Sequence, residues 1–306
     1  MLEICVQSGN WFKEEDPEAS LRFIRECGFD CIDYNIDQFL PGSAINKGEL
    51  TTFFDQSIEE LLTYYATLKK AAEENHIKIT QMHAPFPLYV SDKEDVNEYL
   101  LMVVDKCCAI CQYLGCTALV VHPFSHADKE REKEINMQMY RKMIPSGKRY
   151  DVTLCLENMF TVYRGHITEG ACADVAEVCW YIDTLNAEAG EEVFGYCFDV
   201  GHANLLGRNM CAFVKGLGKR LTILHIHDND GSSDAHLIPY TQKVSGGVNW
   251  DGFIEGLIDI GYQGTLSFET FNGIDRLPEE VRVEGLKLVS AIGRSFQKRI
   301  LAGSEK

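Results

Sequence analysis

Along this chain, short apolar runs alternate with longer segments in which apolar residues recur every three or four positions. The short runs have the length and composition of buried β-strands, and the longer segments have the period of amphipathic helices. The predicted strands cover residues 4–6, 31–34, 77–82, 117–121, 152–156, 194–198, 221–224 and 265–268, and the predicted helices cover 17–27, 57–72, 91–114, 129–144, 174–185, 210–217, 250–260 and 279–300. Each strand precedes a helix, which predicts parallel strands joined by right-handed crossovers. Eight such units predict an α/β protein, a single (β/α)8 TIM barrel that spans residues 1–306.

Local signals mark the ends of several elements. Ser57 with Glu60, and Ser91 with Glu94, have the spacing of helix capping boxes. Gly115 follows the last apolar position of the third helix, as a C-terminal cap does. The loops after the second and seventh strands are the longest and are expected to form the rim of the barrel mouth. An open doubly wound sheet is the alternative fold, and the lack of a G-x-G-x-x-G turn after the first strand disfavours it.

The composition is that of an ordinary globular protein, with 45% hydrophobic and 25% charged residues. The formal net charge of −17 repels phosphate backbones and anionic lipid, so neither nucleic acid nor membrane is an expected partner. The first ten residues lack the regions of a signal peptide, and no apolar run is long enough to cross a bilayer, so we expect a cytoplasmic protein. The 12 cysteines show no recurring C-x-x-C spacing and fall in apolar patterns, as free buried thiols of a reducing compartment do.

Potential metal ligands and acid–base groups follow six consecutive predicted strands. The residues at these strand ends are His83, His122, Glu157, Asp199, His225 and Glu269, and His202 lies three positions after the fourth of them. In a barrel, residues just past the C-terminal ends of the strands converge on one site. A single histidine or glutamate at a strand end is usually structural, but six in succession predict a shared site.

Four of these residues come from successive strands and form an oxygen-rich ligand set: Glu157, Asp199, His225 and Glu269. Three carboxylates and one imidazole favour one divalent ion, Mn²⁺, Mg²⁺ or Co²⁺, with Zn²⁺ as the alternative, and leave positions open for substrate oxygens. The other candidates are expected to contact substrate: His83, His122, His202 and Arg208. For Arg208 the competing interpretation is a solvated surface residue. His227 shares the strand face of His225, or else points into the rim.

The segments around these residues resemble the sugar phosphate isomerase/epimerase superfamily of xylose isomerase-like barrels. The matching segments occur in order over nearly the whole chain: MHAPF, VVHPF, CLEN, CFDVGHAN, LHIHDNDGSSDAHL and LSFE. The resemblance implies the metal quartet Glu157, Asp199, His225 and Glu269. It also implies that the two glutamates flank the substrate and exchange protons with it, and that His202 contacts it. After His236 the Pro-Gly-x-Gly turn of the family is replaced by the longer LIPYTQKVSGGVNW, so the rim is expected to differ there.

The same motifs resemble the apurinic-site endonucleases, which share the fold and bind three zinc ions. The ligands that this second resemblance implies are His83, His122, Glu157, Asp199, His202, His225, Asp234, His236 and Glu269, and all nine have the right residue type. Three features favour the isomerase: the charge of −17, the short loop between His225 and Asp234, and the scattering of basic residues. A dehydratase of the same superfamily and a non-catalytic sugar-binding barrel are further alternatives.

The predicted activity is metal-dependent isomerisation or epimerisation of a small sugar or sugar phosphate through an enediolate. The metal polarises the ketose carbonyl, so that one of Glu157 and Glu269 removes the adjacent proton and the other returns one. Return to the opposite face gives epimerisation, and return to the neighbouring carbon gives aldose–ketose isomerisation. The expected partners are one divalent metal ion and a small-molecule sugar. The sequence leaves open which sugar is used, whether it is phosphorylated, and whether the chain forms a homo-oligomer.

Overall fold

Eight parallel strands form the barrel in this computed structural model, which describes residues 2–50, 53–243 and 245–304. The strands follow the order β10-β1-β2-β3-β4-β5-β8-β9. Their bounds are Ile4–Gln7 (β1), Cys31–Asn35 (β2), Lys78–His83 (β3), Ala118–Val121 (β4), Thr153–Glu157 (β5), Phe194–Asp199 (β8), Leu221–His225 (β9) and Leu266–Phe268 (β10). A parallel bridge between Ile226 and Phe268 joins β9 to β10 and closes the ring. The predicted (β/α)8 barrel is confirmed.

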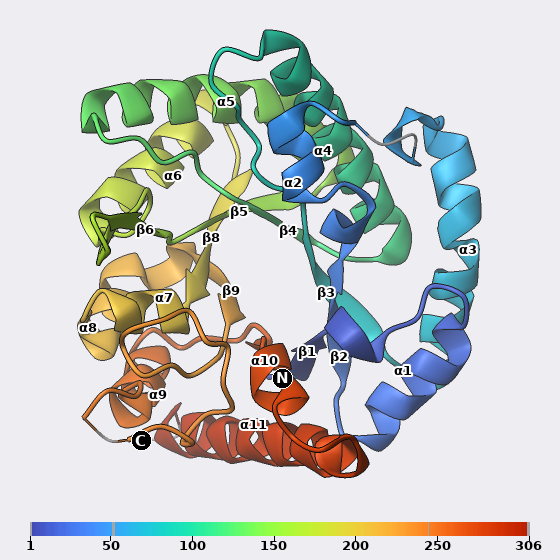
Figure 1. The fold of residues 1–306 in the computed structure, drawn as a ribbon, viewed down its shortest axis with the longest axis vertical. Helices are drawn as coiled ribbons and strands as arrows, with labels where there is room; N and C mark the ends of the chain where they lie inside the picture. Colours follow the sequence, from blue (N-terminus) through green and yellow to red (C-terminus); the bar gives the residue numbers. More distant parts are fainter. Residues whose placement is uncertain (1, 51–52, 244, 305–306) are drawn as a thin grey trace.

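Long helices surround the ring of strands, and short helices lie among the loops at its ends (Figure 1). The long helices are Pro17–Glu26 (α1), Ile58–Asn75 (α3), Glu94–Leu114 (α4), Lys129–Tyr150 (α5), Val175–Ala189 (α6), Met210–Leu217 (α8), Trp250–Asp259 (α9) and Arg282–Ser304 (α11). The short ones are Gly42–Lys47 (α2), Val200–Leu205 (α7) and Phe271–Asp275 (α10), with 3-10 turns at Gly9–Trp11, Ile36–Phe39, Phe53–Asp55, Gly218–Arg220 and Glu279–Val281. Among the described residues, no helix combines the length and apolar character that crossing a bilayer requires.

One of the two predicted capping boxes forms and the other does not. Ser57 caps α3 and exchanges hydrogen bonds with Glu60, as the spacing predicted. The prediction for Ser91 is wrong: α4 begins at Glu94, and its N-cap position is Lys93, without a side-chain cap. The reason is that Asn97 both donates to and accepts from the backbone of Val90, which holds the preceding segment in a turn.

A two-stranded antiparallel hairpin interrupts the connection between β5 and α6. Its strands are Phe160–Tyr163 (β6) and His166–Glu169 (β7), and its tight turn places Arg164 and Gly165 at positive φ angles of 51° and 82°. Two successive positive φ values are typical of a type I′ turn, which matches the twist of a hairpin. No strands were predicted in this segment from the sequence.

Candidate metal centre

A cavity of about 450 Å³ opens among the loops that follow the strands of the barrel. Eight of its lining residues can act as metal ligands or as acids and bases: Asp37, His83, His122, Glu157, His202, Asp234, His236 and Glu269. Asn35, the last residue of β2, and Asp37 just after it line the cavity, as do Asp234 and His236 from the loop after β9. The cavity therefore lies where the ends of the strands were expected to converge.

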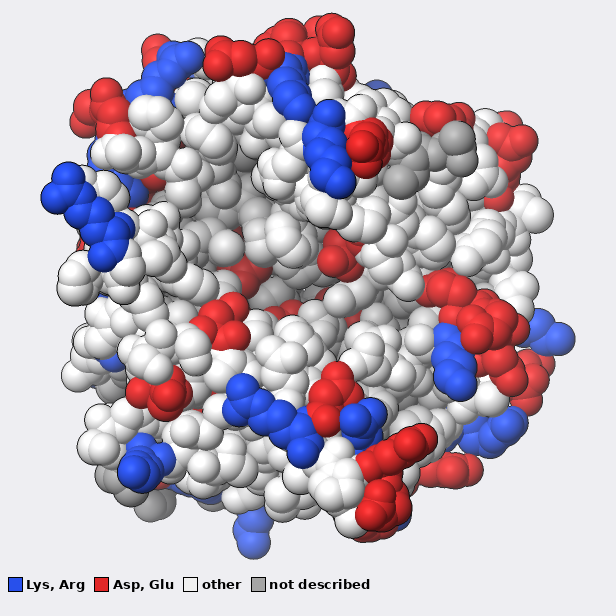
Figure 2. Space-filling model, in the orientation of Figure 1, with Lys and Arg blue, Asp and Glu red and all other residues white. Residues whose placement is uncertain are grey.

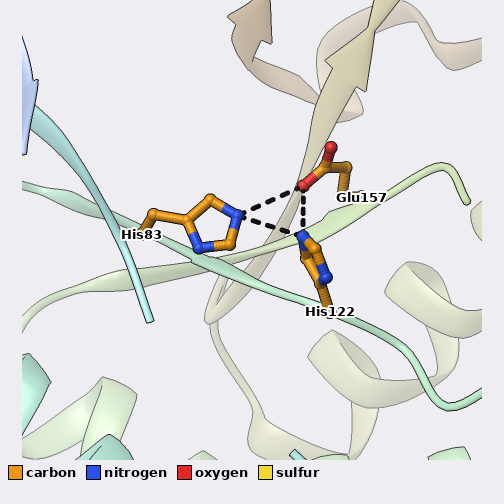
Figure 3. Close-up of side chains that lie close together, drawn as sticks. All are labelled: His83, His122 and Glu157. Carbon is orange, nitrogen blue, oxygen red and sulfur yellow. Dashed lines mark hydrogen bonds and ion pairs between the residues drawn. The ribbon is translucent and has the colours of Figure 1, made fainter. Parts of the chain in front are cut away.

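His83, His122 and Glu157 form a first group, drawn in Figure 3. His122 Nε2 lies 2.9 Å from Glu157 Oε2, and His83 Nε2 lies 3.7 Å from the same oxygen. The two imidazole nitrogens face each other at 3.0 Å. Atoms bound to one divalent ion lie about 3 Å apart, because each is roughly 2.1 Å from the ion. The chemistry and spacing of this group therefore fit a cation.

Glu157 also belongs to a second, deeper group around His225. The Nδ1 atom of His225 lies 3.3 Å from Glu157 Oε1, while Nε2 lies 3.6 Å from Glu269 Oε1. Nε2 is also 3.3 Å from Asp33 Oδ2, a carboxylate that β2 buries completely inside the barrel. Gln81 donates a hydrogen bond of 2.8 Å to that same Asp33 oxygen. The two glutamates expected to transfer protons thus lie on opposite sides of one imidazole.

The fourth member of the predicted quartet, Asp199, has a different main partner. Both of its carboxylate oxygens lie 3.1 Å from Nε2 of His227, which is fully buried. Asp199 also accepts a hydrogen bond from the backbone N–H of His202 and so caps α7. The Nδ1 atom of His202 lies 3.8 Å from Asp199 and 3.6 Å from Glu157, so this imidazole lies between the two carboxylates.

Asp234 joins two imidazoles at the outer side of the cavity. Its Oδ2 atom lies 3.4 Å from His202 Nε2 and 3.2 Å from His236 Nε2. The ring of His236 stacks on that of His227 with 3.9 Å between centroids. The positions that the endonuclease resemblance assigned to metal therefore also lie within ligand distance of one another.

Burial and the neighbouring charges shift the pKa values of these groups in opposite directions. Burial raises the pKa of Glu269 more than His225 and His236 lower it. Burial also acts on Glu157, but His225 and His122 outweigh it and hold the pKa of Glu157 well below its usual value. Burial lowers the pKa of His83, but the hydrogen bond and the charge of Glu157 raise it to about 9. Buried carboxylates that keep imidazoles protonated form a site where a divalent cation can replace the protons.

Arg208 lies outside the cavity lining, and the two phenylalanines after β3 and β4, Phe86 and Phe124, have different surroundings. Arg208 is absent from the residues that line the cavity and forms an ion pair with Glu169 on the hairpin. Phe86 lines the cavity and packs against His122. Phe124 packs against Tyr89 instead.

Several polar residues of the site were not predicted from the sequence. Gln7 donates a hydrogen bond of 2.9 Å to Glu269, and Asp33 and Gln81 support His225 from within the barrel. Gln7 stands at the end of β1, where a polar residue after an apolar run is a recognisable signal. Asp33 and Gln81 lie inside their strands, and no feature of the sequence separates them from ordinary strand residues.

Comparison with known proteins gives one matching family and several distant structures. The model of a family described as xylose isomerase-like TIM barrel matches residues 21–291. An uncharacterised protein, y4fM of Sinorhizobium fredii, is 36% identical over 282 residues, 88% of this chain and 87% of its own. The inosose isomerase of Bacillus velezensis is 21% identical over 88% of this chain and 89% of its own. A solved L-ribulose 3-epimerase superposes with a TM-score of 0.69 at 17% identity, covering 100% of this chain and 95% of its own.

Proposed function

The chain belongs to the xylose isomerase-like TIM barrel family, and we propose that it is a metal-dependent isomerase or epimerase of a small sugar. The observation that carries the proposal is the placement of Glu157 and Glu269 on either side of His225, 3.3 and 3.6 Å from its two ring nitrogens. Both carboxylates also line the cavity, so one can remove a proton from a substrate bound there and the other can return one. The named epimerase and isomerase relatives support the same class of reaction.

The carboxylate and imidazole groups around His225 are of the kinds that bind a divalent metal ion. Glu157, His225 and Glu269 would hold the ion, and Asp199 would join them from the α7 side, next to His202. Carboxylate oxygens with one imidazole suit Mn²⁺, Mg²⁺ or Co²⁺ and accept Zn²⁺. When bound, such an ion supplies Lewis acidity that makes the C–H beside a ketose carbonyl more acidic.

The protein side of the reaction is a proton transfer between the substrate carbon and the two glutamates. One of Glu157 and Glu269 removes the proton beside the carbonyl, and the other returns one. An enediolate forms after the first transfer. Return of a proton to the opposite face gives an epimer, and return to the neighbouring carbon gives an aldose. Gln7, which donates to Glu269, holds that carboxylate in position.

Solvent isotope exchange tests the proposal even while the product is unidentified. The holoenzyme is incubated in D₂O with a panel of ketoses and aldoses, and deuterium at the carbon beside the carbonyl is followed by NMR. Glu157→Gln and Glu269→Gln should each lower exchange at least ~10³-fold, the scale of a lost general acid or base. Glu188→Gln is the matched control, because Glu188 pairs with Arg141 on the outer surface of α6. Wild-type exchange rates in both site variants would refute the assignment.

The grouping of His83, His122 and Glu157 supports a second candidate, a zinc-dependent endonuclease acting at apurinic sites. The metal content of protein purified without chelator separates the two candidates. One equivalent of Mn²⁺, Mg²⁺ or Co²⁺ supports the isomerase. Three equivalents of zinc, together with cleavage of abasic DNA, would replace it. The net charge of −17 favours the isomerase, because affinity for DNA depends on neutralising phosphates.

The cysteines agree with a cytoplasmic location. All 12 are free and 10 of them are buried. Ten buried thiols without a disulfide are expected in a reducing compartment.

A further inference from the structure

We infer that the cavity takes an uncharged polyhydroxy compound rather than its phosphate ester, and that Asn35 and Asp37 bind the hydroxyl groups at its non-reacting end. This inference rests on the proposed function, because it takes the reacting end to lie between Glu157 and Glu269. It adds the charge of the substrate and the residues that select it.

The charge of the cavity wall disfavours a phosphate. Among the described residues that line the cavity there is no lysine or arginine, whereas four are carboxylates: Asp37, Glu157, Asp234 and Glu269. Figure 2 shows acidic side chains within the central hollow, while the basic side chains in view lie around its outside. Arg208, the basic residue predicted to bind substrate, is paired with Glu169. One bound divalent ion would be offset by Glu157 and Glu269, and Asp37 and Asp234 leave two further carboxylates in the lining.

The N-terminus of α7 is not available to a phosphate. A helix N-terminus attracts phosphate through its free N–H groups. At α7, which begins at the mouth, Asp199 caps the helix and accepts the N–H of His202 at 2.6 Å. A buried carboxylate thus already occupies the N-terminus of this helix.

The wall formed by Asn35, the last residue of β2, and by Asp37 has unused hydrogen-bonding capacity. Asn35 Oδ1 and Asp37 Oδ1 are both shielded from solvent, yet the described structure gives neither of them a hydrogen-bond partner. Ser8 fixes the backbone of Asn35 by accepting its N–H at 3.0 Å. Both unpaired atoms are acceptors and need a donor. A sugar hydroxyl can donate to both atoms, whereas a phosphate dianion has no proton to donate and is repelled by the Asp37 carboxylate, so a polyol suits this wall better than a phosphate.

Aromatic rings cover the imidazoles on the remaining sides of the cavity. Phe86 packs on His122, Phe160 on His202 and Phe271 on His236, with centroid separations of 4.4, 5.1 and 4.4 Å. All three phenylalanines line the cavity. Apolar rings beside a few placed polar groups are typical of sites for small neutral ligands, and sugars offer C–H faces to such rings.

Paired ligands test the charge of the substrate. Binding of D-fructose, D-fructose 6-phosphate, D-ribulose and D-ribulose 5-phosphate to the holoenzyme is measured by calorimetry, alongside deuterium exchange in D₂O. We expect at least one free sugar to bind ~10-fold more tightly than its phosphate ester. Equal or tighter binding of the esters, or no binding of any of the four, would overturn the inference. Tighter binding of free sugars without any exchange would instead refute the proposed function and leave this inference standing.

Substitutions in the wall test the two selecting residues. Asn35→Leu and Asp37→Asn should each raise KM for the preferred free sugar about 10-fold and leave kcat within about 3-fold, because they do not touch the reacting carbon. Glu157→Gln should show the opposite pattern. Asp183→Asn is the control for the change of charge, since Asp183 pairs with Arg220 away from the cavity lining. An unchanged KM in both wall variants, with thermal unfolding like that of wild type, would show that these residues do not bind the substrate.

Discussion

The close approach of Gly201 to His227 makes Gly201→Ala an informative perturbation. A Cβ atom at Gly201 would lie 1.9 Å from His227 Cε1 and 2.4 and 2.5 Å from the two ring nitrogens. His227 is fully buried and stacks on His236, and its Nε2 atom contacts both oxygens of Asp199 at 3.1 Å. The imidazole of His227 therefore cannot keep its position beside an alanine, and Asp199 loses its partner.

The cost follows from the contacts that change. Overpacking a buried site costs about 1–3 kcal/mol. A lost hydrogen bond to a charged group adds about 1.5–3 kcal/mol. Because alanine has a higher helix propensity than glycine, the substitution in α7 also stabilises the helix by up to ~1 kcal/mol. We expect Gly201→Ala to lower the free energy of unfolding by about 1.5–6 kcal/mol, and to weaken metal binding about 10–100-fold because Asp199 is no longer oriented.

Urea unfolding followed by circular dichroism measures the stability, and titration with Mn²⁺ or Zn²⁺ measures the affinity. The double variant Gly201→Ala/His227→Ala is the control, because it removes the ring that the new methyl group would strike. Its loss of stability should be smaller than the sum of the two single losses by at least ~1 kcal/mol. A Gly201→Ala protein with wild-type stability and metal affinity would refute the packing argument.

Two further predictions concern the scaffold. Asp30 accepts hydrogen bonds from the Ile4 N–H at 3.0 Å and from Arg294 at 2.7 Å, so Asp30→Asn should lower the free energy of unfolding by about 1–3 kcal/mol at pH 7, measured in urea. Burial raises the pKa of Asp30, but the hydrogen bonds and the charges of its partners outweigh it, so the pKa is lowered. The contribution of Asp30 to stability is therefore complete above its unfolded pKa of about 3.9 and disappears as the pH falls through the lower folded value. A difference in stability between wild type and Asp30→Asn that does not shrink in acid would contradict this. Ser57→Ala should cost about 1 kcal/mol in thermal unfolding because it removes the cap of α3, whereas Ser91→Ala, at an exposed turn, should stay within about 0.5 kcal/mol of wild type. Equal effects of the two serine substitutions would show that the Ser57 cap adds nothing.

The barrel could be predicted because its strands are buried on both sides and separated by clear helix signals. Apolar runs such as that of β4 stand out from their neighbours, and Gly115 ends α4 with a left-handed φ of 76°, as expected. The β6–β7 hairpin was not predicted because its strands have four residues each and are partly exposed, so no buried apolar run marks them. The Arg164–Gly165 pair between two β-rich runs was the available signal.

The positions of the site residues could be predicted better than their pairing. The end of each strand points to the barrel mouth in any TIM barrel, so His83, His122 and Glu157 had to lie near one another. The support of His225 by Asp33 depends on which interior side chains meet across the barrel, at strand positions far apart in the sequence. Periodicity gives the face of a strand on which a residue lies, but it does not give the depth at which two strands bring their side chains together.

The His225–Ile226–His227 segment shows this limit most clearly. Residues two apart share one face of a strand, so the sequence alone cannot say which histidine is central. They differ in depth, by about 6.6 Å along an extended chain. In the structure His225 lies beside Glu157 and Glu269, while His227 contacts Asp199. Asp199 is paired in register with His225 on the neighbouring strand, yet its carboxylate contacts His227, so the predicted quartet falls into more than one ligand group. The number of bound ions, more than the identity of any single ligand, therefore decides between proton transfer on a sugar and hydrolysis at an apurinic site.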